Sequence, residues 1–175
     1  MRKPKKPRSR KAGLPPGSLV HIGEIKTATP GISVLDFGPA ALAEAGMPDV
    51  AALVAYRREN STLWGNVYGL HDAADLAAIG AAFQWHPLVL EDILNNNQRQ
   101  KVDAYDNYLY VVLHRYEITS EPLDVVQDQI SLVIGPDYLL SFQERPSRTF
   151  EPVRQRLRSD RETCAPRRPT CWPIR

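Results

Sequence analysis

The sequence predicts an α/β fold in which helices cover the faces of a mixed β-sheet. Two observations support this: strand-like and helical segments follow one another along the chain, and two late strands are joined by a tight turn. The 175 residues, 43% hydrophobic and 24% charged, suit one globular domain with an adequate core. The expected strands are residues 18–25, 32–37, 62–70, 105–118, 129–134 and 138–143.

The first part of the chain is expected to hold a hairpin, two short helices and a strand. A loop rich in threonine, proline and glycine separates residues 18–25 from residues 32–37, which favours a hairpin. Residues 39–45 and 49–56 are rich in alanine and are predicted to be helical, with breaks at Gly46 and Pro48. In the strand at residues 62–70, Leu63, Gly65, Val67 and Gly69 lie opposite Trp64, Asn66, Tyr68 and Leu70.

Two consecutive helices are predicted in the middle of the chain. Asp72 is a suitable N-cap for the first, because its carboxylate can accept hydrogen bonds from unpaired amides. The second begins at Pro87, since proline at the first helical position gives up only an amide hydrogen that would have no partner, and it runs to about Asn95. The inward stripes are Leu76, Ile79, Ala82 and Phe83 in the first helix and Val89, Leu90, Ile93 and Leu94 in the second.

The last part is expected to contain a central strand, a hairpin and a helix. Both faces of residues 105–118 are largely apolar, which indicates a strand covered on both sides. A turn of Gly135, Pro136 and Asp137 joins the two strands that follow. The helix predicted at residues 147–158 places Phe150, Val153 and Leu157 on one stripe.

The candidate functional residues are Glu91 and Asp92, on the outward face of the helix that starts at Pro87. Carboxylates supply the hard oxygen ligands that Mg²⁺ and Ca²⁺ prefer. The two side chains diverge by about 100 degrees, so one ion with ideal octahedral geometry cannot bind both, and a site would need ligands from elsewhere. The alternative is that these acidic residues face water near a helix N-terminus, where the macrodipole favours them.

Several segments, taken in order, resemble the cytoplasmic domain of the CorA family of magnesium and cobalt channels. HPLVLEDIL, an asparagine-rich turn, QRQKV and the aromatic segment YDNYLYVVLHRYE follow one another between His86 and Glu117. Further similarity lies in PPGSLVHIGE, LWGNVYGLHD, DQISLVIGPDYLLSFQER and FEPVRQRLRS. The resemblance spans about residues 15–158 and implies the α/β fold of a CorA cytoplasmic domain.

The resemblance also implies a function. In the family, five copies assemble in the plasma (inner) membrane, and intracellular Mg²⁺ bound between neighbouring cytoplasmic domains holds the pore closed. Glu91 and Asp92 match the acidic pair that contributes to those sites, so a regulatory Mg²⁺ is expected here, with Co²⁺ as the other candidate ion. A zinc-transporting branch of the same superfamily is the alternative, because its domains share the architecture.

The chain also departs from the family. Its longest apolar segment, residues 76–83, is 8 residues long, whereas a membrane-spanning helix needs about 20. The partner aspartates on later helices and the glycine-methionine-asparagine signature at the pore mouth are missing. We therefore expect a truncated domain, cytoplasmic on its own, that cannot itself transport ions and that binds Mg²⁺ weakly.

The two ends differ from the body in composition. Residues 1–13 are expected to be a disordered basic tail, which would contact anionic lipid rather than nucleic acid. Residues 14–158 form the expected domain. Residues 159–175 are expected to be irregular, since three prolines and both cysteines, Cys164 and Cys171, interrupt any helical period. Our hypothesis is that this last segment is read out of frame.

Other classes of protein find less support in the sequence. No nucleophile with a base, no glycine-rich phosphate loop and no metal cluster with suitable spacing is evident, so we do not expect an enzyme. His21, His71, His86 and His114 are interpreted as structural. A soluble cation-sensing module and a nucleic-acid-binding module based on the basic tail are the remaining alternatives.

Overall fold

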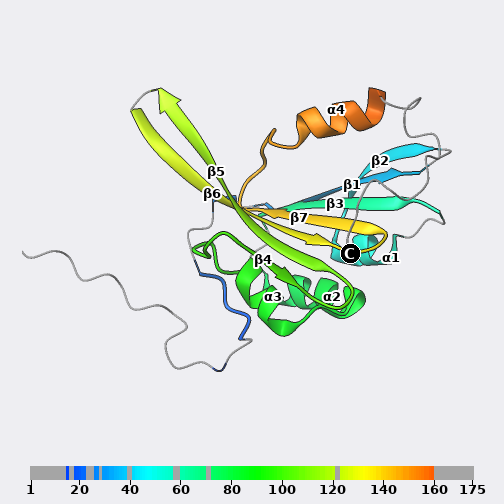
Figure 1. Cartoon of the computed structure of the whole chain (residues 1–175), viewed down its shortest axis with the longest axis horizontal. Helices are drawn as coiled ribbons and strands as arrows, with labels where there is room; N and C mark the ends of the chain where they lie inside the picture. The colour runs from blue at the N-terminus through cyan, green and yellow to red at the C-terminus, as the bar shows by residue number, and fades with distance from the viewer. Residues whose placement is uncertain are drawn as a thin grey trace, which may run out of the picture.

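The computed structural model describes residues 15, 18–22, 26–27, 29–38, 41–56, 60–69, 72–120 and 123–159, and within them seven strands form one mixed sheet (Figure 1). Across the sheet the strand order is β2-β1-β3-β7-β6-β5-β4. In chain order the elements are β1 (Gly31–Phe37), β2 (Leu42–Met47), α1 (Val50–Ala55), β3 (Thr62–Tyr68), α2 (Ala73–Phe83), α3 (Pro87–Ile93), β4 (Lys101–Ala104), β5 (Leu109–Ser120), β6 (Leu123–Ile134), β7 (Tyr138–Gln143) and α4 (Glu151–Ser159).

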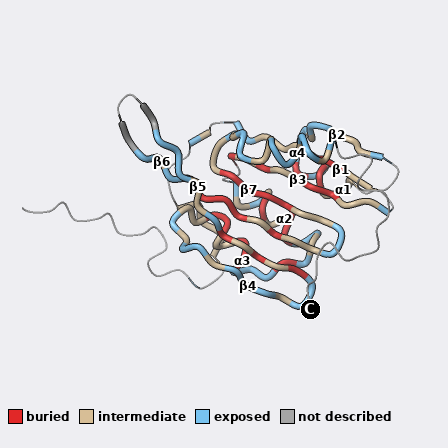
Figure 2. Tube along the Cα trace, turned by 45° about the horizontal axis from the view of Figure 1, so that its top comes forward, coloured by how far each residue is buried: buried red, intermediate tan, exposed pale blue. Residues whose placement is uncertain are grey.

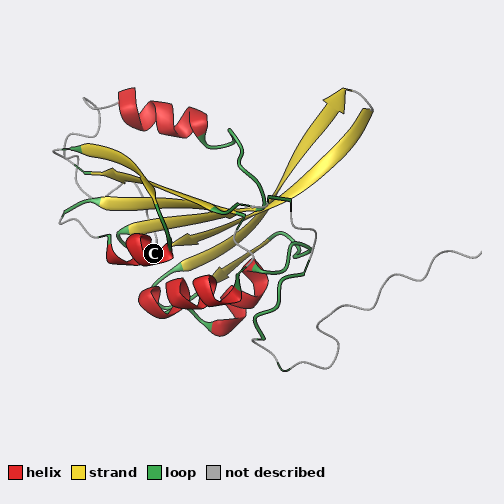
Figure 3. Cartoon of the chain, turned by 180° about the vertical axis from the view of Figure 1, so that it is seen from behind, coloured by secondary structure: helices red, strands yellow, loops and turns green. Residues whose placement is uncertain are grey.

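The parallel pairing of β3 with β7 joins the two halves of the sheet. It sets Gly65 opposite Leu140, and all the other neighbouring strands pair antiparallel. Helices lie on both faces, with α1, α2 and α3 on one side and α4 on the other (Figures 1 and 3). The predicted mixed sheet covered by helices is therefore confirmed.

The main core lies between the sheet and α1–α3. Alternate residues of β3 face it, so Leu63 and Val67 are buried there, while Trp64 faces α4, as the predicted alternation requires. Figure 2 shows the buried positions concentrated along the middle strands and the inner sides of the helices. Asp49 and Asp72 accept hydrogen bonds from Ala52 and Ala74 and so cap α1 and α2, the second as predicted.

Two predictions for the first part of the chain are wrong. The predicted hairpin is absent, because β1 pairs with β2 and β3 instead of with a strand at 18–25. Within residues 18–22 the only bridge is the one between Ile22 and Asn95. In the segment predicted to be helical at residues 39–45, the described residues 41–45 are not helical: residues 42–45 belong to β2, which pairs with β1 from Leu42 to Met47. The helix preference of alanine is worth only a fraction of a kcal/mol, so pairing with an existing strand overrides it.

The predicted central strand is also wrong in position and in cover. Residues 105–108 form the connection between β4 and β5, and β5 lies next to the sheet edge. Its far half extends with β6 as a two-stranded arm beyond the helices (Figure 1). Tyr116 and Ile118 are 58% and 72% exposed there, because none of the described helices or strands covers this part of the sheet. The apolar pattern marked a strand without revealing that half of it leaves the core.

The helix predictions need smaller corrections. In α2, Ala82 is exposed and Gly80 is buried in its place, against α3. The last helix begins at Glu151, after residue 147, and Val153 is 48% exposed, because α4 touches the sheet only along part of its length. The predicted β6–β7 hairpin is confirmed. The tail predicted at residues 159–175 starts one residue too early, because Ser159 ends α4. The rest of that tail with both cysteines, the tail at residues 1–13 and His71 lie outside the described residues.

Candidate cation site on helix α3

The start of α3 is held by His86 and Pro87. The His86 ring accepts a hydrogen bond from the Leu88 amide at 3.2 Å, and the His86 amide donates to the Tyr108 hydroxyl at 2.9 Å. Pro87 occupies the first turn, as predicted. The hydrogen bond to Tyr108 therefore anchors the start of the helix to the β4–β5 connection, and His86 has the structural role expected of it.

The inner face of α3 matches the prediction. It packs closely on α2 because Gly80 has no side chain: a Cβ there would lie 2.6 Å from the methyl carbons of Leu90. This close packing fixes the rotation of α3 about its axis and so decides where its other face points. The buried residues are Val89, Leu90, Ile93 and Leu94.

Asp92 is less open to solvent than predicted. Its side chain is 17% exposed, because the chain after α3 folds back over it. One carboxylate oxygen accepts a hydrogen bond from the Gln98 amide, and the other accepts one from the Lys101 ammonium at 2.7 Å. Glu91 precedes it on the helix and is partly exposed. Asp92 therefore ties α3 to the start of β4.

Lys101 lies between two carboxylates. Its ammonium is 2.7 Å from Asp92 and 2.7 Å from Asp103, and it lies 5.4 Å from the centroid of the Tyr110 ring. Burial lowers the pKa of Lys101, but hydrogen bonds to Asp103 and Asp92 and their negative charges raise it more, so the net shift is upward. The ammonium thus stays charged at neutral pH.

Sequence reasoning missed this lysine. Lys101 and Asp103 are two residues apart on one strand, so their side chains lie on the same face, and this can be predicted from the sequence. The neighbouring sequence does not show that this face lies beside Asp92. In the part of the chain that the structure describes, no three His, Cys, Asp or Glu side chains lie close enough to hold a metal ion. Glu91 and Asp92 offer suitable oxygens for Mg²⁺, but the single chain supplies at most part of a site.

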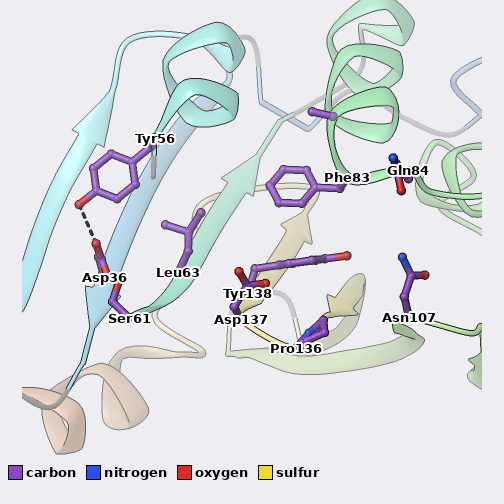
Figure 4. Close-up of a pocket in the computed structure, with 11 residues that line it drawn as sticks. Asp36, Tyr56, Ser61, Leu63, Phe83, Gln84, Asn107, Pro136, Asp137 and Tyr138 are labelled. Atoms are coloured by element: carbon purple, nitrogen blue, oxygen red, sulfur yellow. Dashed lines mark hydrogen bonds between the residues drawn. The ribbon is translucent and has the colours of Figure 1, made fainter. Parts of the chain in front are cut away.

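A separate pocket of about 280 Å³ lies where β1, α1 and β3 meet the end of α2 and the β6–β7 turn (Figure 4). Asp36 lines it and is 1% exposed, and the Tyr56 hydroxyl donates a hydrogen bond to its carboxylate at 3.1 Å. Phe83 and Tyr138 pack against each other on another wall, with ring centroids 4.7 Å apart. Neither Glu91 nor Asp92 lines this pocket, so it is distinct from the α3 site.

Solved structures define the class of the fold. The chain is similar to the full-length CmaX protein, with a TM-score of 0.58 and 13% identity over 75% of this chain and 40% of that one. It is also similar to the ZntB cytoplasmic domain from Vibrio parahaemolyticus, with a TM-score of 0.50 and 14% identity over 74% of this chain and 50% of that one. The fold is that of CorA and ZntB cytoplasmic domains.

Sequence comparison then gives the family. The sequence model described as CorA-like Mg²⁺ transporter protein matches residues 59–170, and the chain belongs to this family. It is 35% identical over 153 residues to the cobalt/magnesium transport protein CorA of Thermotoga maritima, covering 87% of this chain and 43% of that protein. It is 30% identical over 89 residues to the magnesium transporter ALR1 of Saccharomyces cerevisiae, covering 50% of this chain and 10% of that one.

The resemblance noted in the sequence is therefore confirmed. The chain spans less than half the length of each of these two relatives. Among the described residues, none of the helices has both the length and the apolar character needed to cross a membrane.

Proposed function

We propose that this chain is the cytoplasmic cation-sensing and assembly domain of a CorA-type divalent-cation transport protein that carries Mg²⁺ or Co²⁺. The observation that carries the proposal is the 35% identity, over 87% of the chain, to a cobalt/magnesium transport protein. The domain would act at the cytoplasmic side of the membrane in a homo-oligomer, as the family resemblance implies. It would respond to the ion rather than conduct it.

Glu91 and Asp92 are the proposed ligands of a regulatory Mg²⁺. Asp92 is partly accessible, its carboxylate oxygens suit the ion, and the single chain supplies too few ligands, which together support a site shared with a neighbouring copy. When bound, Mg²⁺ would supply positive charge that holds carboxylates of two subunits together. A zinc-transporting relative is the second candidate, because the fold is also similar to a ZntB cytoplasmic domain.

Thermal unfolding of the 175-residue chain in MgCl₂, CoCl₂ or ZnCl₂, compared with NaCl at equal ionic strength, tests this proposal. A ligand bound only by the folded state at about ten times its dissociation constant stabilises it by about 1.4 kcal/mol, which is a rise in melting temperature of about 3 to 6 °C for a chain of this size. We expect that rise in Mg²⁺ or Co²⁺ and its loss in both Glu91→Ala and Asp92→Ala.

The control is Asp106→Ala, which removes an exposed carboxylate from the β4–β5 connection and should leave the rise unchanged. An equal rise in the parent and in Asp92→Ala would mean that the cation acts by general screening, and the proposal would be rejected. A rise confined to Zn²⁺ would favour the zinc-transporting alternative.

A further inference from the structure

The ammonium of Lys101 occupies the place beside Asp92 that a dissolved cation would take. It donates to the Asp92 oxygen Oδ2, and the other oxygen, Oδ1, already accepts a hydrogen bond from Gln98. Both oxygens of the carboxylate thus have partners from the same chain. A divalent cation that binds directly to Asp92 therefore has to approach an oxygen that already accepts a hydrogen bond.

The local charges show which partner is the competitor. Lys101 contributes one positive charge and Asp92 and Asp103 contribute two negative charges, so the three groups carry one net negative charge. A divalent cation would neutralise the two carboxylates fully, whereas the ammonium neutralises them only by half. Gln98 is neutral, so the hydrogen bond that its amide nitrogen donates does not repel a cation, whereas Lys101 has to move away because like charges repel.

Access to the group is open. The side chain of Lys101 is 33% exposed, and that of Asp103 is 39% exposed. The lysine stem is flexible and its ammonium hydrates strongly, so the displaced group can turn into water without unfolding the strand. The Lys101 ammonium can therefore pass between its position beside Asp92 and a displaced position in water without rearrangement of the sheet.

We infer that Lys101 is a tethered competing cation that lowers the affinity of Asp92 for divalent ions. It holds the two carboxylates together while the divalent ion is scarce, and it is displaced when the ion is abundant. This inference rests on the proposed function, since it describes how the same site is regulated. An ion pair near the surface is worth up to about 1 kcal/mol, so removing this competition should tighten binding by up to about fivefold.

Calorimetric titration of the full chain with MgCl₂ tests the inference in three variants. Lys101→Met keeps an unbranched, slightly shorter side chain but removes the charge and with it the contact of the ammonium with the Tyr110 ring, and it should bind Mg²⁺ up to about fivefold more tightly than the parent. Lys101→Arg keeps the charge and should not show the gain in affinity expected of Lys101→Met. Arg99→Met removes an exposed positive charge two residues earlier and serves as the matched control, with unchanged affinity.

A second measurement on the parent does not depend on the folding of any variant. In ¹H–¹⁵N spectra of lysine ammonium groups, the ammonium of Lys101 should give a protected signal without Mg²⁺ and lose it at saturating Mg²⁺. Retention of this signal while Mg²⁺ is bound in a manner that requires Asp92 would overturn the inference.

The outcomes separate this inference from the proposed function. Binding that depends on Asp92 in the parent, but is equal or weaker in Lys101→Met, would reject only the competing role of Lys101. If only Lys101→Met, and not the parent, binds Mg²⁺ in a manner that depends on Asp92, the competing role of Lys101 is supported and cation sensing by the parent is rejected. If neither protein binds Mg²⁺ in a manner that depends on Asp92, both proposals are rejected.

Discussion

Asp128 holds together three cationic side chains at the base of the β5–β6 arm. Its carboxylate is 4% exposed, accepts hydrogen bonds from Lys26 at 2.9 Å and from Arg145 at 2.8 Å, and is also bonded to Arg115. Burial raises the pKa of Asp128, but the hydrogen bonds from Arg115, Lys26 and Arg145 lower it more, from 3.8 to about 2. Folding therefore favours the ionised form of this residue.

The expected consequence is a loss of stability in acid that depends on Asp128. Because the pKa is lower in the folded state, the stabilisation is complete above about pH 4 and disappears as the pH falls through about 2. We expect Asp128→Asn to lower the free energy of unfolding at pH 7 by about 2 kcal/mol. The difference from the parent should vanish near pH 2, as urea denaturation at a series of pH values would show.

Asp106→Asn is the control for this experiment, since it changes an exposed aspartate in the β4–β5 connection. It should follow the parent at every pH. A constant difference between the parent and Asp128→Asn from pH 7 to pH 2 would show that the ionisation of Asp128 does not contribute.

At the scale of the element, α4 covers the second face of the sheet without a buried residue of its own. Phe150, just before it, meets Trp64 edge to face, with ring centroids 5.4 Å apart. The Arg154 guanidinium lies 5.2 Å from the centroid of the Trp64 ring and donates to Ser33 and Glu44, each at 3.1 Å. Beside the hydrogen bonds from Arg158 to Glu44, the helix is thus held on the sheet by the planar side chain of Arg154.

Replacing that side chain should loosen the helix. Arg154→Lys keeps the charge but loses the planar group that stacks on Trp64 and reaches two acceptors, so we expect a loss of about 1 kcal/mol and a change in tryptophan fluorescence. Arg156→Lys, on the exposed side of the same helix, should change neither quantity. Equal effects of the two substitutions would contradict the role assigned to Arg154.

At the scale of the whole molecule, the β3–β7 pairing decides whether the domain unfolds as one unit. We call the boundary between β3 and β7 the seam. The two strands lie close together at Gly65, where an added Cβ would meet the side chain of Leu140. Gly65→Ala should therefore cost about 1 to 3 kcal/mol through overpacking. Because one core spans the seam, Trp64 and Trp85 should report the same denaturation midpoint in the parent.

Single-tryptophan reporters would test that cooperativity. With Trp172 replaced by phenylalanine in both proteins, fluorescence of Trp64→Phe follows the region around Trp85, and fluorescence of Trp85→Phe follows the region around Trp64. In each of these backgrounds the fluorescence midpoint should equal the midpoint from far-ultraviolet circular dichroism. Separate midpoints within one protein would show that the two sides of the seam unfold independently.

The family, the mixed sheet, α2 and α3 with their N-terminal signals, the alternation of β3 and the β6–β7 hairpin were all predictable from the sequence. These features depend on residues that are close along the chain, such as Asp72 at a cap, Pro87 at a helix start and Gly135 in a turn. The acidic pair of the candidate site was visible for the same reason, since helical periodicity places Glu91 and Asp92 away from the buried stripe.

The strand order, β2, the exposed arm and the partners of Asp92 depend on contacts between distant segments and could not be predicted from the sequence. Residues 42–47 form a strand because β1 is available to pair with them, against the local preference of alanine. Asp92 meets Lys101 because the chain after α3 turns back onto the helix. The physical reason is that local periodicity fixes which way a side chain points from its own element, whereas its neighbours are fixed by how distant segments pack together.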